Sequence, residues 1–171
     1  MAGSLIKVDE EIVTSAVSSV TLTGIDSTYD VYMVKINKLE SDTDNSETRF
    51  RVTTSGTPDT SSNYDRAYKL LRSTSSFINL STTNASYWFY NQNGNNTGEQ
   101  QNGTMYLFNF NNASEYSFIT FESAELTSAS ELQGLQGGAV HTVAQASDGI
   151  QIFVNTGNID NGTFTLYGLK K

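Results

Sequence analysis

Residues 104–123, TMYLFNFNNASEYSFITFES, decide the fold class of this chain. Two runs rich in aromatic and β-branched residues, 104–110 and 116–123, are separated by a polar connection of five residues, 111–115. Residues of these kinds favour strands, and a short polar connection between two strands is typical of an antiparallel hairpin. The segment therefore predicts two neighbouring antiparallel strands.

Strand patterns of the same kind recur on both sides of this hairpin. Residues 47–54 alternate cleanly, with Phe50 and Val52 on one face, whereas residues 29–39 carry apolar side chains on both faces, as a central strand does. We count about ten strands, and residues 124–138 hold the one plausible helical turn. The other expected strands are 12–22, 64–71, 139–144, 150–154 and 163–169, with short apolar segments at 77–80 and 87–90 and a polar loop at 91–103.

A sheet with one apolar face needs a second layer to cover that face. We therefore expect an all-β fold, an antiparallel two-sheet β-sandwich of about ten strands with jelly-roll connectivity. Residues 12–171 are expected to form this single domain, and residues 1–11 an N-terminal arm or an edge strand. The predicted core residues are Phe108, Phe118, Ile152, Phe164 and Leu166.

Composition excludes several classes of function. The 171 residues carry a net charge of -8, and an acidic chain repels phosphate backbones, so we expect no nucleic-acid partner. The absence of cysteine excludes disulfides, thiolate metal sites and cysteine nucleophiles. No run approaches ~18 consecutive apolar residues, so we expect no membrane insertion. Asp9, Glu10 and Glu11 interrupt the N-terminus, so we expect no signal peptide.

The sequence offers little for catalysis, and we expect no enzyme and no cofactor. His141 is the only histidine, and neither a G-x-S-x-G nor an H-E-x-x-H motif occurs. A lone histidine on a strand is most simply a polar surface residue. Glu122 and Glu125 are a conceivable pair of carboxylates, but sequence alone cannot place them across a cleft at the separation that glycoside hydrolysis requires.

One acidic segment has the composition of a cation site. Residues 42–47, DTDNSE, place Asp42, Asp44, Asn45 and Glu47 close together, and hard oxygen ligands at such spacing could hold calcium. The glycine and the distal glutamate of an EF-hand loop are absent. Because Asp and Asn also favour turns through their own backbone hydrogen bonds, the alternative is a solvated hairpin turn.

Two other segments suggest contacts with a ligand or a partner. Trp88 and Tyr90 precede the Asn/Gln-rich loop, and exposed aromatic rings beside amide groups would suit a sugar; the alternative is that both rings pack in the core. Leu5, Ile6 and Val8 lie in an arm that could add a strand to another subunit; the alternative is an edge strand of this domain.

The order of the segments resembles a known family. The most specific piece is the terminal motif G-T-F-x-L-Y-G at residues 162–168, GTFTLYG. The other pieces are residues 29–32 (YDVY), 49–52 (RFRV), 56–64 (GTPDTSSNY), 105–121 and 136–138 (QGG). Together these pieces resemble small virion proteins of tailed phages, best known from marine and cyanobacterial phages.

The resemblance implies a β-sandwich structural protein on the virion, assembled in the host cytoplasm, with no catalytic residues. It implies a capsid decoration or knob protein bound to the major capsid protein or to neighbouring virion subunits, either as a monomer or as a homo-oligomer. The alternative is a tail or fibre module that binds a receptor or a host-surface glycan. A decoration protein needs a flat apolar face or a strand edge, whereas a binding module needs an exposed aromatic site.

Overall fold

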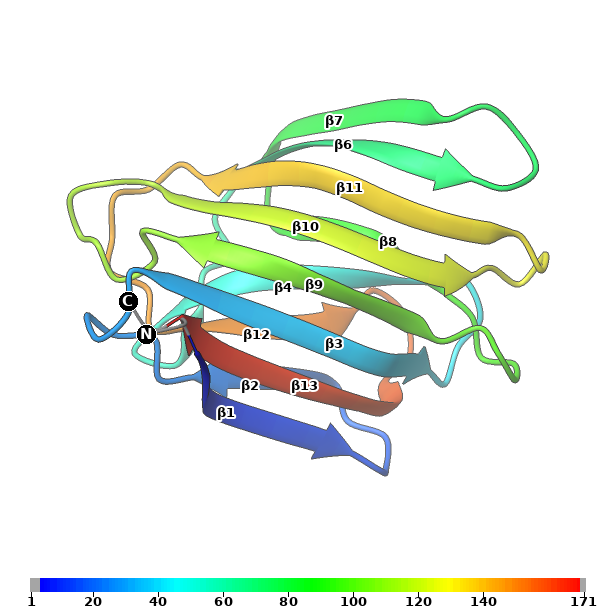
Figure 1. Ribbon diagram of the computed structural model, residues 1–171, viewed down its shortest axis with the longest axis horizontal. Helices are drawn as coiled ribbons and strands as arrows, with labels where there is room; N and C mark the ends of the chain where they lie inside the picture. Colours follow the sequence, from blue (N-terminus) through cyan, green and yellow to red (C-terminus); the bar gives the residue numbers. More distant parts are fainter. Residues whose placement is uncertain (1–3, 170–171) are drawn as a thin grey trace.

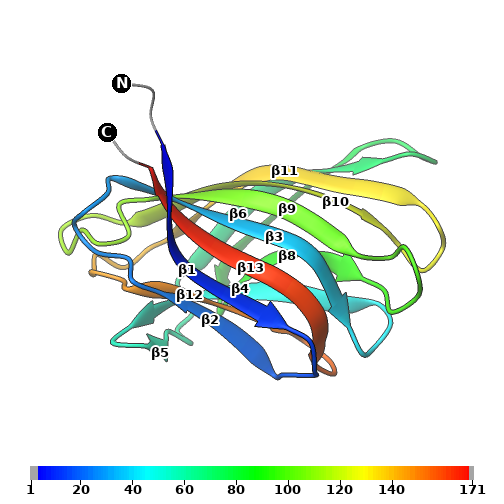
Figure 2. The ribbon, with the colours of Figure 1, turned by 60° about the horizontal axis from the view of Figure 1, so that its bottom comes forward.

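The computed structural model describes residues 4–169, and every regular element in that range is a β-strand. Thirteen strands form two sheets in which all pairings are antiparallel. The two sheets pack face to face (Figure 1 and Figure 2). The predicted all-β, two-sheet sandwich is confirmed, with thirteen strands in place of about ten. Its jelly-roll connectivity stays a prediction.

The larger sheet has eight strands, in the spatial order β1, β13, β3, β9, β10, β11, β6, β7. Their bounds are β1 (Leu5–Val13), β3 (Val31–Ser41), β6 (Tyr64–Arg72), β7 (Ile78–Ala85), β9 (Gln101–Phe108), β10 (Ser117–Leu126), β11 (Leu132–His141) and β13 (Ile159–Leu169). β1 and β7 are therefore the two edges of this sheet, at the bottom and the top of Figure 1.

The smaller sheet has five strands centred on β4. Its strands are β2 (Ser19–Thr23), β4 (Ser46–Thr54), β5 (Thr57–Pro58), β8 (Trp88–Asn93) and β12 (Gly149–Val154). β12 lies between β2 and β4, and the other side of β4 pairs with β8 and then with β5. This sheet is narrower than its partner, so it cannot cover the larger sheet from edge to edge.

One contiguous core joins the two sheets, and aromatic side chains from β8 lie at its centre. Trp88 packs edge to face against Tyr64, with ring centroids 5.2 Å apart, and Tyr90 packs the same way against Phe50, also at 5.2 Å. Aromatic pairs in this geometry stabilise a core by more than their buried area alone. Tyr90 also packs against Phe121 of β10, with ring centroids 5.8 Å apart, so β8 connects the smaller sheet to the larger one.

Several expected elements differ in extent from the observed ones. The predicted helical turn within 124–138 is wrong, because β10 continues to Leu126, β11 begins at Leu132 and only residues 127–131 turn between them. The single strand expected at 12–22 is divided between the end of β1 and β2. The polar loop at 91–103 is shorter than expected, because β8 runs to Asn93 and β9 begins at Gln101.

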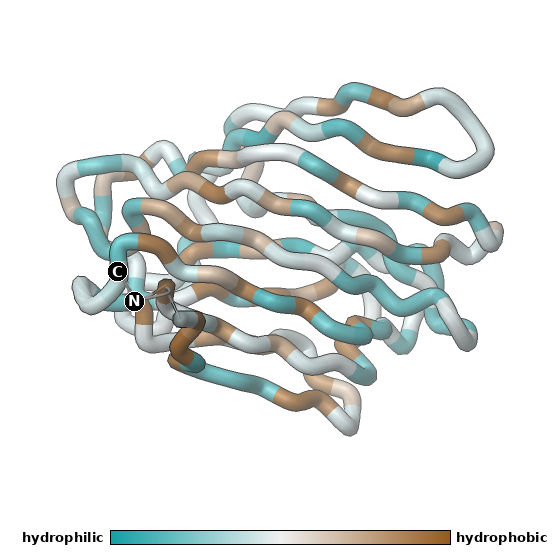
Figure 3. Tube along the Cα trace, viewed as in Figure 1, coloured by the Kyte–Doolittle hydropathy of each residue, from teal (hydrophilic) through white to brown (hydrophobic). Residues whose placement is uncertain are grey.

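Three of the five predicted core residues are confirmed, and two are not. Ile152, Phe164 and Leu166 are fully buried. Phe108 is only half-buried, and Phe118 is 45% exposed, because the two side chains lie opposite each other on the outer face of the larger sheet. The inward positions of this hairpin are Met105, Leu107, Ile119 and Phe121. Polar and apolar residues are interspersed along both sheets (Figure 3), so the inner face of these strands is not obvious from sequence.

The assignment of faces is testable with one pair of substitutions. We expect Phe164→Ala to lower the free energy of unfolding by ~3–5 kcal/mol, because it opens a cavity at a fully buried site. Phe118→Ala removes a ring of the same size from an exposed site and should cost less than ~1 kcal/mol. Urea denaturation of both variants measures the difference. Equal losses in the two variants would show that the faces of β10 are assigned wrongly.

Candidate binding surfaces

The N-terminal segment forms an edge strand of the domain. β1 pairs with β13 along its length, with Leu5 opposite Leu169, and a carboxylate oxygen of Asp9 accepts a hydrogen bond from the amide of Thr23 in the smaller sheet, at 2.7 Å. Leu5 and Ile6 are exposed and Val8 is half-buried. The edge-strand alternative is therefore the one observed for Leu5–Val13, whereas residues 1–3 of the expected arm lie outside the described residues.

Trp88 and Tyr90 are core residues, so they offer no stacking surface to a sugar. Each is 1% exposed. The Trp88 indole donates a hydrogen bond to the carbonyl of Val140, at 3.2 Å, and the Tyr90 hydroxyl donates one to the carbonyl of Glu122. Buried rings of this kind normally find such partners for their polar atoms. The packing alternative considered for these residues is the correct one.

His141 is fully buried, so its expected position on the polar surface is wrong. It lies on the inner face of β11 with Nε2 3.1 Å from the Asp59 carboxylate and its ring 4.7 Å from that of Tyr64. Burial lowers the pKa of His141, and the nearby Asp59 carboxylate opposes only part of that effect. Ser117 lies opposite His141 in the register and is fully buried as well. Both are closed off from solvent, so a substrate could not reach them in this structure.

Glu122 and Glu125 lie on opposite faces of β10, so they cannot act on one substrate as a pair. Glu122 is exposed on the outer face, and Glu125 is 3% exposed between the sheets. They are three positions apart along the strand, and side chains alternate between faces along a strand. The two carboxylates therefore belong to different environments.

Glu125 is the centre of a buried polar cluster at one end of the sandwich. Its carboxylate accepts hydrogen bonds from the side-chain amides of Asn91 and Gln101, the second at 3.5 Å. Burial raises the pKa of Glu125 to about 7, although hydrogen bonds from Asn91, Ser123 and Gln101 act in the opposite direction. Tyr90 lies against the same cluster, and burial together with the Glu125 carboxylate raises its pKa.

The acidic turn at residues 42–47 directs its oxygens to different partners. Asp42 accepts hydrogen bonds from the backbone and the side-chain amide of Asn158, both at 2.9 Å. Glu47 forms an ion pair with Arg49 at 2.6 Å, and Asp44 accepts a hydrogen bond from the amide of Asn45. These contacts are those of a structured turn. Within residues 4–169, no group of three or more His, Asp or Glu side chains is placed to hold a metal ion.

The part of the chain that the structure describes contains no helix that could cross a membrane.

The two edges of the larger sheet differ in charge. β1 (LIKVDEEIV) carries four charged side chains and has a register shift between Lys7 and Asp9, features that protect an edge from pairing with another chain. β7 (INLSTTNA) carries no charged side chain, although its register with β6 also shifts, between Tyr64 and Arg66. β7 is therefore the edge of the sheet that charge does not protect.

β7 also carries apolar side chains that the smaller sheet leaves uncovered. Ile78 and Leu80 pair with Leu70 and Tyr68, whose side chains face the smaller sheet, yet Ile78 and Leu80 are 38% and 39% exposed. β7 lies past the limit of the smaller sheet at the top of Figure 1, and Figure 3 shows apolar residues along it. We call the surface formed by β7 and the side chains of Leu70, Ile78 and Leu80 the β7 overhang.

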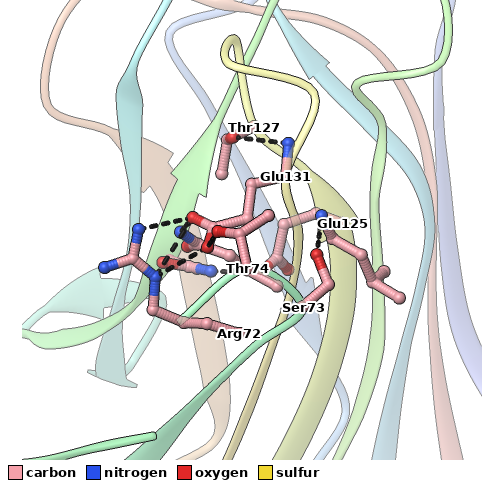
Figure 4. A network of polar contacts seen from close by, with 9 residues as sticks. Arg72, Ser73, Thr74, Glu125, Thr127 and Glu131 are labelled. Atoms are coloured by element: carbon pink, nitrogen blue, oxygen red, sulfur yellow. Dashed lines mark hydrogen bonds and ion pairs between the residues drawn. The ribbon is translucent and has the colours of Figure 1, made fainter. Parts of the chain in front are cut away.

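A polar network fixes the connection that leads into β7. The Glu131 carboxylate, in the turn after β10, accepts hydrogen bonds from Arg72, at 3.0 Å, and from the hydroxyl of Thr74 (Figure 4). Ser73 exchanges backbone and side-chain hydrogen bonds with Leu132. Hydrogen bonds from Arg72, Thr74 and Gln133 lower the pKa of Glu131 to about 2, so this carboxylate stays charged. The network therefore orients an otherwise exposed edge strand.

Sequence analysis did not find the β7 overhang. The expected apolar segment at 77–80 was the only signal, and β7 extends five residues past it, to Ala85, through the polar run STTNA. Polar runs of Ser, Thr and Asn resemble loops by composition. The absence of charge in this run was the signal that could have marked an unprotected edge.

The raised pKa of Glu125 predicts a distinct pH dependence of stability. The folded-state pKa of about 7 lies above the ordinary 4.5. The contribution of Glu125 to stability is therefore fully present below pH 4.5 and is lost as the pH rises through 7. We expect Glu125→Gln to match the wild type near pH 4.5 and to exceed it by ~3 kcal/mol at pH 8.5.

Urea denaturation at the two pH values measures this difference. His141 is present in both proteins, so its opposite contribution, a loss of stability as the pH falls below 6.5, cancels in the comparison. Glu122→Gln, at an exposed site of the same strand, controls for the loss of one carboxylate. A gain from Glu125→Gln that is the same at both pH values would show that Glu125 is not forced to ionise in the core.

Comparison with known proteins identifies no relative of this chain. No protein-family model matches it, and searches of the curated proteins and of the solved structures give no match.

Proposed function

We propose that this chain is a non-enzymatic structural protein of a phage virion, a capsid decoration or knob protein attached to the major capsid shell. The β7 overhang is the observation that supports attachment to the shell. The order of the sequence segments supports the assignment to a virion. The protein would act at the particle after assembly in the host cytoplasm. The N-terminal segment, the other candidate for the anchor, is already paired with β13 and with the smaller sheet.

The β7 overhang fits a strand of a neighbouring subunit. An edge strand presents a row of free backbone donors and acceptors, and an added strand satisfies them. Every residue of β7 except Thr82 and Ala85 is exposed, and no charged side chain stands in the way. Ile78 and Leu80 would pack against the apolar side of the incoming strand. Main-chain pairing and burial of these side chains would then act together.

Charge complements this contact. The chain carries a net charge of -8, so a shell face with compensating positive charge would attract it. Complementary charge mainly accelerates encounter and excludes wrong partners, whereas the buried apolar contact slows dissociation. The same overhang could pair with β7 of a second copy, which would give a homo-oligomer.

The runner-up function is a tail or fibre module that binds a receptor or a glycan. It differs from the decoration protein in its place on the particle, and Trp88 and Tyr90 cannot supply its binding site because both are buried. Immunogold labelling of intact particles separates the two. Label on capsids supports the decoration protein, and label confined to tails contradicts it.

Two lysine substitutions on opposite edges test the attachment. Leu80→Lys places a charge in the β7 overhang, where pairing would have to desolvate it, so we expect binding to capsids stripped of the native protein to weaken about tenfold or more. Ile12→Lys places the same charge on β1, where Ile12 is 63% exposed, and should bind as the wild type does. Co-sedimentation with stripped capsids measures occupancy.

Equal binding by Leu80→Lys and the wild type would contradict attachment through the β7 overhang. Sedimentation equilibrium of the free protein completes the test. A dimer that Leu80→Lys dissociates, without any binding to capsids, would assign the overhang to a second copy and not to the shell.

A further inference from the structure

The outer face of the larger sheet carries side chains in rows that cross the strands. One row is entirely polar, and each of its members pairs with the next in the register. We call it the polar row; it consists of Glu10, Thr165, Lys35, Thr104, Glu122, Gln136 and Lys69. The neighbouring row includes Tyr167, Met33, Tyr106, Thr120, Gly138 and Ala67.

A hollow lies in the middle of these two rows, over β9, β10 and β11. Its volume is about 310 Å³. It is lined by Thr104, Tyr106, Thr120, Phe121, Glu122, Gln136 and Gly137. The Tyr106 ring forms one wall and is 39% exposed, and the hydroxyl of Thr104 lies 3.5 Å from the Glu122 carboxylate. The hollow therefore combines one flat aromatic surface with hydroxyl, amide and carboxylate groups.

Gly138 borders the hollow beside Thr120, which lines it, and the fold does not require a glycine there. It lies opposite Thr120 on one side and Ala67 on the other, on the outer face. A Cβ at Gly138 would meet only the Ile119 carbonyl oxygen, at 3.5 Å, which is an ordinary contact, and the φ angle of Gly138 is not positive. At Gly137, by contrast, a Cβ would lie 2.4 Å from the Tyr68 side chain. Glycine weakens a strand, so its presence at 138 calls for another reason.

We propose that this hollow, with the polar row beside it, binds a neutral oligosaccharide that lies across the strands. An aromatic ring stacks on the apolar face of a sugar, and short hydroxyl, amide and carboxylate groups hydrogen-bond its hydroxyls. Adjacent strands are ~4.8 Å apart, which is comparable to the length of one sugar unit. The polar row can therefore offer a partner to successive units, except at Thr165, which is buried and donates its hydroxyl hydrogen bond to Glu10.

Other ligand classes fit this face less well. β9, β10 and β11 are paired on both sides, so a peptide cannot add to them as a strand. Lys35 and Lys69 are the only cations in the polar row, which also holds two acidic members, and the whole chain is acidic, so polyanions are disfavoured. The inference does not depend on attachment through the β7 overhang, because the hollow lies on β9, β10 and β11 and the overhang on β6 and β7.

Binding is tested with the full chain and defined sugars. The probes are cellohexaose, maltohexaose, xylohexaose, mannohexaose, laminarihexaose and chitohexaose, with hexagalacturonate as the acidic comparison. Titrations followed by amide NMR shifts should show at least one neutral hexasaccharide binding, with shifts centred on Tyr106, Thr120 and Gln136. No binding by any neutral probe at millimolar concentration, or binding of hexagalacturonate alone, would overturn the proposal.

Three substitutions locate the site. Tyr106→Ala removes the stacking surface and should weaken binding about tenfold. Gly138→Ile places a branched side chain that favours strands beside Thr120, at the border of the hollow, so binding should weaken while the midpoint of thermal unfolding is unchanged or higher. Phe118→Ala removes an exposed ring from the same face but outside the hollow and should bind as the wild type does. Unchanged binding by Gly138→Ile, or loss of binding by Phe118→Ala, would contradict this placement.

Discussion

The unequal width of the two sheets constrains every other feature of this molecule. Eight strands face five, so the smaller sheet can close the core only over part of the larger one. Its β8 strand concentrates the contact by placing Trp88 and Tyr90 against the middle of the larger sheet. At the β1 edge the sandwich closes through Asp9 and Thr23, whereas at the β7 edge Ile78 and Leu80 stay 38% and 39% exposed. The candidate attachment surface is thus a direct consequence of sheet width.

The structure also contains residues that stabilise the fold by burial and others whose burial costs free energy. Fully buried residues such as Phe164 and Leu166 need no polar partner. Glu125, at the end of the sandwich, keeps a carboxylate in a place where burial disfavours its charge. Glu131 keeps its charge, because Arg72 and Thr74 bind it at the surface end of the same hairpin. One hairpin therefore contains a carboxylate that weakens the fold at neutral pH and another that orders its edge.

Sequence patterns predicted the fold class and most of the strands, because alternation and turn composition are local properties. They did not predict β7, whose polar run resembles a loop until β6 pairs with it. They also could not predict which face of the strand carries His141, since one histidine between valines is compatible with either face. Only the pairing of β11 shows that His141 points inward, beside Asp59. Features that depend on which strand lies beside which are invisible to local patterns.

The hairpin formed by β9 and β10 shows how one such ambiguity affects both core and function. Its two faces both carry aromatic residues, and side chains alternate at every residue, so exchanging the faces moves the whole set. With Phe118 assigned inward, Tyr106 and Thr120 would be core residues and no outer hollow would exist. In the observed register Ile119 and Phe121 fill the core, and Tyr106 is left on the outside beside Thr120. Which alternate residues of one strand face inward thus decides whether the aromatic residues of this hairpin stabilise the fold or face a ligand.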